Sequence, residues 1–81
     1  MQQLILSSYL AYQNIRDTWC VGSYGSYNSL NDAMSACTAD ATCGKVYDEN
    51  CDNQDVFKLC KKNTQVIVAS SGSCIYEKKG R

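Results

Sequence analysis

The sequence predicts a small α+β domain held together by disulfide bonds, with one helix packed on a short-stranded, mostly antiparallel sheet. Three observations carry this prediction: six cysteines in 81 residues, one well-capped amphipathic segment, and several short β-rich runs separated by turn residues. A chain of this length is enough for one domain only, and its hydrophobic core alone is a marginal source of stability. We therefore expect a single stapled domain over residues 1–81.

The helix is expected at about residues 30–40. Ser29 is a good N-cap, and Asp32 follows three residues later, close to the spacing of a capping box. Gly44 provides a natural stop soon after the helix. Apolar residues repeat at the spacing of a single helical face, at Leu30, Ala33, Met34 and Cys37.

Runs rich in β-branched and aromatic residues predict strands after the helix, at residues 45–47, 56–60, 65–69 and 74–78. Before the helix, residues 1–19 fit an extra strand ending at Trp19 or an N-terminal extension. The apolar run near the start lacks basic residues, so we interpret it as mature sequence and not as a signal peptide. Residues 21–29, rich in Gly, Ser and Tyr, are expected to form a loop. Residues 20–79 hold the cysteine framework.

The cysteines fit a disulfide framework better than a metal or thiol site. No two of them are separated by fewer than five residues and the chain has no histidine, whereas zinc sites need closely spaced Cys or His pairs. The same lack of histidine excludes a Cys–His nucleophile within the chain. A framework of this kind forms in oxidising compartments, so a secreted or extracellular protein is expected.

Placement along the chain favours one pairing among the many that six cysteines allow. The helix cysteine should meet a cysteine on a strand packed against the core-facing side of the helix. Two cysteines that flank a short segment should close a small loop, and the first and last should join the ends of the domain. The predicted bonds are Cys20–Cys74, Cys37–Cys60 and Cys43–Cys51.

The stretch "SLNDAMSACTADATCGKVYDENC" has one cysteine at the core-facing end of a helix, a second just past it, and Gly-x-Val-Tyr-Asp leading to a third. It resembles the PAN/apple family of extracellular domains, and "SCIYEKK" resembles the closing strand of that family. The resemblance covers residues 20–79. It implies a sheet wrapped on one helix, the nested disulfide pattern given above, and a role in binding proteins or carbohydrates. It implies no catalytic residues.

Charge and composition exclude several function classes. Eight basic and eight acidic residues give a formal net charge of zero, which disfavours nucleic acid as a partner. No stretch approaches the about 20 apolar residues of a membrane span. Catalysis is not expected, because the chain has no histidine to pair with a nucleophile. The sequence predicts a non-enzymatic extracellular recognition or adhesion module that binds a protein or carbohydrate. The alternative is a free-standing secreted effector, such as a toxin, antimicrobial or signalling peptide.

Two segments carry the candidate binding residues. Tyr24 and Tyr27 lie in the Gly/Ser-rich loop, and tyrosine gives rigid amphipathic contact area. The acidic segment 48–55 adds Asp48, Asp52 and Asp55 as further ligand-binding candidates.

The acidic segment also has carboxylates at the first and fifth positions of a calcium loop, but it lacks the glycine and the final glutamate of an EF-hand. We expect no metal or cofactor, and favour a solvated acidic loop. The alternative left open is a weak calcium site made by Asp48, Glu49, Asp52 and Asp55.

Four lysines and one tryptophan are further candidates for a binding surface. One alternative is a small basic patch for sulfated glycans, made by Lys45, Lys58, Lys61 and Lys62. Basic and acidic residues alternate along the chain, so a mixed surface is the favoured interpretation. Trp19, beside Cys20, is expected to pack in the core and not to contact a ligand.

Overall fold

The computed structural model describes residues 12–54 and 56–79. Its elements are β1 (Tyr12–Arg16), β2 (Thr18–Cys20), β3 (Tyr24–Tyr27), α2 (Leu30–Ala39), β4 (Cys43–Asp48), β5 (Phe57–Lys61), β6 (Val66–Val68) and β7 (Cys74–Lys78). The predicted helix and the four predicted strands after it are confirmed, with ends that shift by one or two residues. The second half of the predicted N-terminal strand forms β1 and β2. The part of that prediction before Tyr12 lies outside the described residues.

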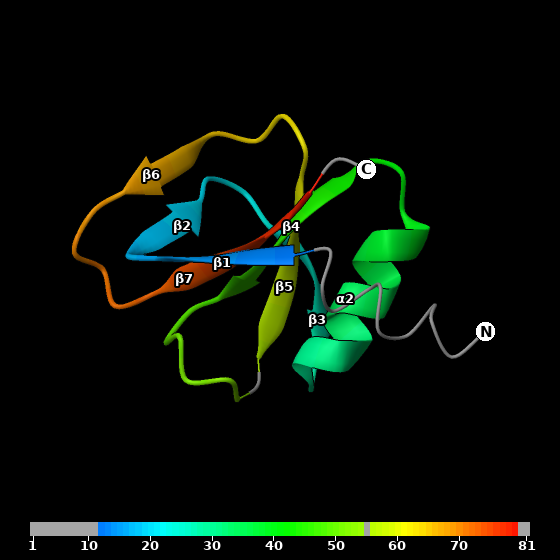
Figure 1. Ribbon diagram of the computed structural model, residues 1–81, viewed down its shortest axis with the longest axis horizontal. Coiled ribbons are helices and arrows are strands. Elements are labelled where there is room, and N and C mark those ends of the chain that lie inside the picture. Colours follow the sequence, from blue (N-terminus) through cyan, green and yellow to red (C-terminus); the bar gives the residue numbers. More distant parts are fainter. Residues whose placement is uncertain (1–11, 55, 80–81) are drawn as a thin grey trace.

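The molecule has three layers. Five strands form an antiparallel sheet in the order β1-β7-β4-β5-β3, and β2 and β6 form a separate antiparallel pair. Helix α2 packs against β4, β5 and β3, whereas β2 contacts β7 and β4. Figure 1 shows the helix and the β2–β6 pair on opposite sides of the five-stranded sheet. The α+β class, with one helix and a mostly antiparallel sheet, is therefore confirmed.

Strand alternation divides the core into two clusters, one on each face of the large sheet. On the helix side, Val46, Phe57 and Leu59 pack with the buried face of α2. On the other side, Cys20, Cys60 and Ile75 are buried together under the β2–β6 pair. Partly buried side chains pack against the edge of this second cluster, namely Ile15, Tyr47 and Val66.

The helix begins and ends as its sequence directs. Ser29 is the N-cap, and its hydroxyl accepts the main-chain N–H of Asp32 at 3.1 Å. The four predicted apolar positions, from Leu30 to Cys37, are the buried ones. At the other end, the ammonium group of Lys78 donates to the carbonyls of Cys37, Asp40 and Cys43, at 2.7, 3.3 and 3.0 Å. Lys78 therefore ties the helix end to the start of β4.

Two predictions for the segment before the helix are wrong. The expected loop at residues 21–29 contains strand β3, which pairs with β5 at the edge of the large sheet. Its glycines interrupt the β pattern in the sequence, and the register shift between Tyr24 and Tyr27 accommodates Gly25 at positive φ. Trp19 is not a core residue: it is 36% exposed on the outer side of β2, opposite Ile67.

All six cysteines form disulfides, as predicted, but the nested pairing is wrong in every bond. The observed bonds are Cys20–Cys60, Cys37–Cys43 and Cys51–Cys74. They replace the predicted Cys20–Cys74, Cys37–Cys60 and Cys43–Cys51.

Strand alternation accounts for the loss of the predicted helix-to-strand bond. Leu59 points at the helix, so the next residue, Cys60, points away from it and meets Cys20 under the small sheet. Cys37 instead bonds to Cys43 at a Cα–Cα distance of 5.2 Å, because the chain turns back beneath the helix end and starts β4 there.

The third bond closes the opposite end of the sheet. Cys74 is the register partner of Asp48 at the end of β4, and Cys51 follows in the next turn. The Cα atoms of Cys51 and Cys74 are therefore 5.2 Å apart. Because Cys74 is bonded to Cys51, Cys20 is bonded to Cys60 instead.

Candidate functional site

Five of the six lysines gather at one end of the large sheet. All five, Lys45, Lys61, Lys62, Lys78 and Lys79, line two adjoining hollows in the surface. Lys61, Lys62 and Lys79 are exposed, and we call these three side chains and the two hollows the lysine surface. Lys78 is half-buried and Lys45 is only 5% exposed, so these two form the floor of the second hollow.

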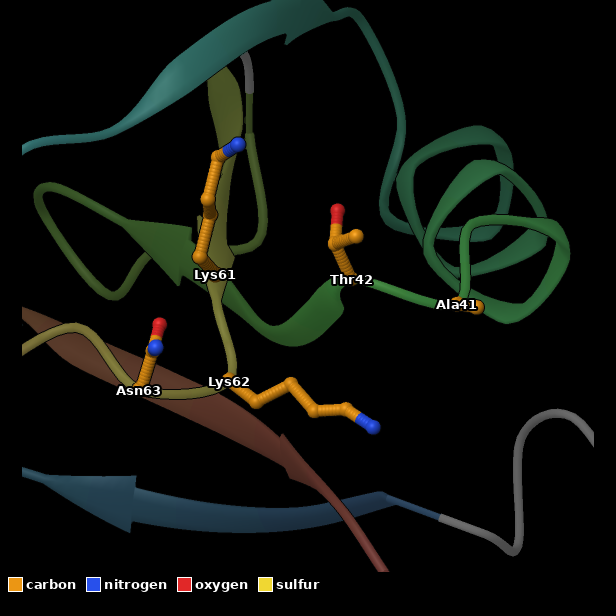
Figure 2. Close-up of a pocket in the computed structure, with 5 residues that line it drawn as sticks. All are labelled: Ala41, Thr42, Lys61, Lys62 and Asn63. Atoms are coloured by element: carbon orange, nitrogen blue, oxygen red, sulfur yellow. The ribbon is translucent and has the colours of Figure 1, made fainter.

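The first hollow lies where the end of α2 faces the turn after β5 (Figure 2). Its volume is about 350 Å³, and its lining is Ala41, Thr42, Lys61, Lys62 and Asn63. Figure 2 shows the ammonium groups of Lys61 and Lys62 pointing in different directions, on either side of Thr42. The hollow therefore has separated positive charges with uncharged polar groups between them.

The second hollow adjoins the first at Lys62. Its volume is about 230 Å³, and its lining is Cys43, Gly44, Lys45, Lys62, Glu77, Lys78 and Lys79. Because Lys62 lines both hollows, a ligand longer than one small group can contact the two together.

A network of hydrogen bonds fixes the wall of the first hollow. The Tyr24 hydroxyl donates to one carboxylate oxygen of Asp40 at 2.7 Å. The other oxygen accepts the main-chain N–H and the hydroxyl of Thr42, at 2.9 and 2.8 Å. The Lys61 ammonium lies 5.6 Å from the centre of the Tyr24 ring, within cation–π range. Tyr24 thus orders both the carboxylate and the lysine.

These contacts set the ionisation of the network. The hydrogen bond from Tyr24, followed by those from Thr42, lowers the pKa of Asp40 from its ordinary value of 3.8 to about 2. Partial burial, and then the bond to Asp40, raises the pKa of the Tyr24 hydroxyl. Asp40 is therefore ionised at neutral pH, with three of its acceptor positions directed into the protein and not toward a ligand.

The two hydrogen-bonded lysines support the surface from below. The Lys45 ammonium donates to the carbonyls of Lys61 and Lys62 at 3.1 and 3.0 Å, which holds the end of β5 in place. The ammonium of Lys78 is bonded to three carbonyls at the helix end. Burial, and then the nearby charge of Lys62, lowers the pKa of Lys78. Exposed ammonium groups remain on Lys61, Lys62 and Lys79.

The structure separates the predicted binding residues. Tyr24 lies at the edge of the lysine surface, through its contacts with Asp40 and Lys61. Tyr27 is half-buried against the helix-side core and is paired with Phe57, so it is part of the fold and not of an exposed loop. The predicted tyrosine loop does not exist as such, although one of its two residues remains near a site.

The acidic segment, residues 48–55, begins at the other end of the sheet, where Asp48 at the end of β4 pairs with Phe57 at the start of β5. Asp48 is 1% exposed, and its carboxylate accepts the main-chain N–H groups of Cys51 and Asn53, at 3.1 and 2.9 Å. The turn itself uses both of its oxygens, so the structure does not favour Asp48 as a ligand-binding residue. Asp52 is exposed and accepts the N–H of Gln54. Asp55 lies outside the described residues.

The acidic segment brings no metal-binding group together in the described structure. Among residues 12–54 and 56–79, no three Asp, Glu, Cys or His side chains are close enough to hold an ion. The calcium alternative included Asp55, so it stays a prediction.

The alternative to the favoured mixed surface is a basic patch made by Lys45, Lys58, Lys61 and Lys62, and the structure brings three of these four lysines to one end of the sheet. Lys61 and Lys62 are at the surface, Lys45 is buried beneath them, and Lys58 lies further down β5, paired with Tyr47. The patch also includes Lys78 and Lys79, which the sequence analysis did not place there.

A signal for the missing lysines exists in the sequence. The pairs Lys61-Lys62 and Lys78-Lys79 each come at the end of a predicted strand. Strands β5 and β7 both pair antiparallel with β4, so they run in the same direction and their C-terminal ends lie at the same end of the sheet. The two lysine pairs lie near each other because β5 and β7 flank β4, and the sequence alone does not show this strand order.

Helix α2 is too short and too polar to cross a membrane, and it is the sole helix among the residues that the structure describes. Comparisons of the chain with protein-family models, with curated proteins and with solved structures gave no match. The lysine surface, with its two adjoining hollows, is the candidate binding site of this chain.

Proposed function

We propose that this chain is a non-enzymatic extracellular recognition module and that it binds its ligand, a protein or a carbohydrate, through the lysine surface. The observation that carries the proposal is the pair of adjoining hollows that share Lys62. A concave surface with a few fixed polar groups is the usual form of a ligand site.

The rigidity of the surface supports recognition. The first hollow is bounded by Thr42, held through Asp40 and Tyr24, and by the turn after β5, held through Lys45. The N–H of Lys62 also donates to the carbonyl of Thr42 at 2.8 Å, which joins the two walls directly. A site ordered before binding loses less conformational entropy when the ligand arrives.

Three further observations fit an extracellular binding module. Three disulfides staple the domain, as is common for small secreted domains. The one-helix α+β architecture is of the kind that the PAN/apple resemblance implies, although the disulfide pairing differs from that family's nested pattern. The charged groups at the two hollows are lysines and Glu77, with Asp40 held beside them by Tyr24 and Thr42, and a mainly positive surface of this kind suits the binding of a charged ligand.

The test is a binding screen with charge-reversal variants. The folded chain, displayed as a tetramer, is applied to an array of glycans and to a panel of extracellular proteins. Lys62→Glu reverses a charge that both hollows share, and Lys58→Glu makes the same change further along β5. We expect a bound partner to be lost with Lys62→Glu and kept with Lys58→Glu.

One result of the screen would contradict the proposal. If every partner that the screen detects binds both variants as well as the unaltered chain, the lysine surface is not the binding site. Thermal melting of each variant confirms that the comparison is made between folded proteins.

A further inference from the structure

We propose that the ligand of the lysine surface is a polyanionic carbohydrate, one whose successive sugar units carry sulfate or carboxylate groups. This inference rests on the proposed function and names the chemical class of its ligand.

The positive charge of the surface is local, since the chain as a whole has a formal net charge of zero. Lys61, Lys62 and Lys79 are exposed, while Lys45 and Lys78 add positive charge from hydrogen-bonded positions below. Among residues 12–54 and 56–79, the carboxylates at the two hollows are Asp40, whose oxygens are engaged by Tyr24 and Thr42, and Glu77 in the second hollow. Ammonium groups therefore outnumber carboxylates here, and an anionic ligand is favoured.

The directions of the lysines favour several anionic groups over one. In Figure 2 the ammonium groups of Lys61 and Lys62 extend in different directions, so in this arrangement they are not directed at one small anion. Lys79 extends the positive charge into the second hollow, past Lys62. A chain with anionic groups at intervals can place one group at each lysine.

The uncharged lining favours carbohydrate over protein. The hydroxyl of Thr42 donates to Asp40 and keeps a lone pair for a ligand donor, and the amide of Asn63 offers both donors and acceptors. Such groups suit sugar hydroxyls. The core of a protein–protein interface is rich in aromatic side chains, and the residues that line the first hollow include none.

The exposed apolar side chains are elsewhere. Trp19, Val21 and Val68 belong to the β2–β6 layer, on the far side of the large sheet from the helix. A protein partner would gain more from that layer than from the lysine surface, which strengthens the assignment of the lysine surface to a carbohydrate.

The experiment measures the affinity of the full chain for five probes by titration calorimetry. The probes are a heparin octasaccharide, a hyaluronan octasaccharide, a neutral maltooligosaccharide, an oligoglutamate peptide and phosphatidylserine vesicles. Each is tested with the unaltered chain, with the double variant Lys61→Gln/Lys62→Gln, and with Lys58→Gln as the matched control.

We expect one or both acidic oligosaccharides to bind and the neutral one not to bind. The double variant should weaken the affinity by at least about tenfold and Lys58→Gln by less than about twofold, because only the first removes charges that face the ligand. Binding should also weaken strongly at about 1 M salt, where charges are screened beyond about 3 Å. Binding of heparin alone identifies sulfate as the recognised group, and binding of both identifies anionic groups in general.

Other outcomes overturn the proposal. These are tighter binding of oligoglutamate or vesicles than of either acidic sugar, equal binding of the neutral sugar, equal binding by the double variant, or no binding of any probe. In each of these cases the screen with Lys62→Glu still decides whether the lysine surface binds a ligand of another class. The failure of this inference is thereby distinguishable from failure of the proposed function.

Discussion

At the scale of single residues, Gly44 is where the start of β4 comes closest to the turn after β5. A Cβ atom at this position would lie 2.5 Å from the Cα of Lys62 and 3.2 Å from its main-chain nitrogen. Both are backbone atoms, so the clash cannot be relieved by a side-chain rotation. The absence of a side chain at Gly44 is therefore what lets the two walls of the lysine surface approach.

The substitution Gly44→Ala should lower the free energy of unfolding by about 2 kcal/mol, as overpacking of a close contact does. Gly22→Ala is the matched comparison: no atom lies within 4 Å of its added methyl, and only its positive φ is unfavourable, which costs about 1 kcal/mol. Urea denaturation measures both. A smaller loss at Gly44 than at Gly22 would contradict the close approach.

Asp40 predicts how stability changes in acid. Its pKa in the folded protein, about 2, lies below the ordinary value of 3.8, so the folded state favours the ionised carboxylate. Its contribution to stability is complete above about pH 4 and is lost as the pH falls through about 2. Asp40→Asn should therefore lose less of its melting temperature between pH 4 and pH 2 than the unaltered chain does.

Tyr24→Phe provides an independent check of the same network, because it removes the hydrogen bond that lowers the pKa of Asp40 most. It should also flatten the acid dependence of the melting temperature. Identical pH profiles for the unaltered chain and both variants would show that Tyr24 and Thr42 do not stabilise the ionised carboxylate.

At the scale of elements, Lys78 connects three of them. It lies on β7, and its ammonium donates to carbonyls at the end of α2 and the start of β4. An ammonium has three donors, and a positive charge is favourable at a helix C-terminus. The side chain thus ends the helix and fixes it on the sheet beside the lysine surface.

Lys78→Met keeps the length of the side chain and removes its donors, so it should cost about 2 kcal/mol of unfolding free energy. The same change at its exposed neighbour, Lys79→Met, should cost less than about 0.5 kcal/mol. Chemical denaturation compares the two. Equal losses would mean that the ammonium of Lys78 does not stabilise the helix end.

The elements that could be predicted are those whose signal is local. The helix has a cap at Ser29 and apolar residues at one helical spacing, and strand β7 was predicted with the bounds that it has. Strand β3 was missed because Gly25 and the surrounding serines have low β propensity, and its pairing with β5 overrides that preference. Trp19 was misplaced for a similar reason: its exposure depends on which side of β2 the large sheet covers.

At the scale of the whole molecule, the order of strands decides both the disulfides and the site. Alternation in β5 could have excluded Cys60 as a partner for the helix, since Phe57 and Leu59 already face it. The arrangement β7-β4-β5 could not be read from the chain, and it alone brings Lys61-Lys62 beside Lys78-Lys79. The lysine pairs themselves are visible in the sequence, but the sequence does not show that the two pairs lie side by side in the fold.

The disulfides predict a graded loss of stability. The bonds close sequence separations of 40, 23 and 6 residues, for Cys20–Cys60, Cys51–Cys74 and Cys37–Cys43 respectively. Restriction of the unfolded chain gives about 4, 3 and 2 kcal/mol for them in that order. Paired Cys→Ser variants should lose stability in the same order in thermal or urea unfolding.

Mass spectrometry of unreduced peptides checks the pairing on which this order depends. Peptides that link Cys20 to Cys60 and Cys51 to Cys74 are the expected products. Recovery of a Cys20–Cys74 peptide would contradict the arrangement of the sheet, because it would place the start of the framework at the wrong end of β7.

The measurement that tests the central claim most directly is an amide chemical-shift titration of the ¹⁵N-labelled chain with the heparin octasaccharide. We predict that the largest shifts fall at Thr42, Lys61, Lys62 and Asn63, with smaller ones at Lys79, around the two hollows. Shifts concentrated instead on the β2–β6 pair or on the turn after β4, or no shifts at all, would contradict the assignment of the lysine surface to a polyanionic carbohydrate.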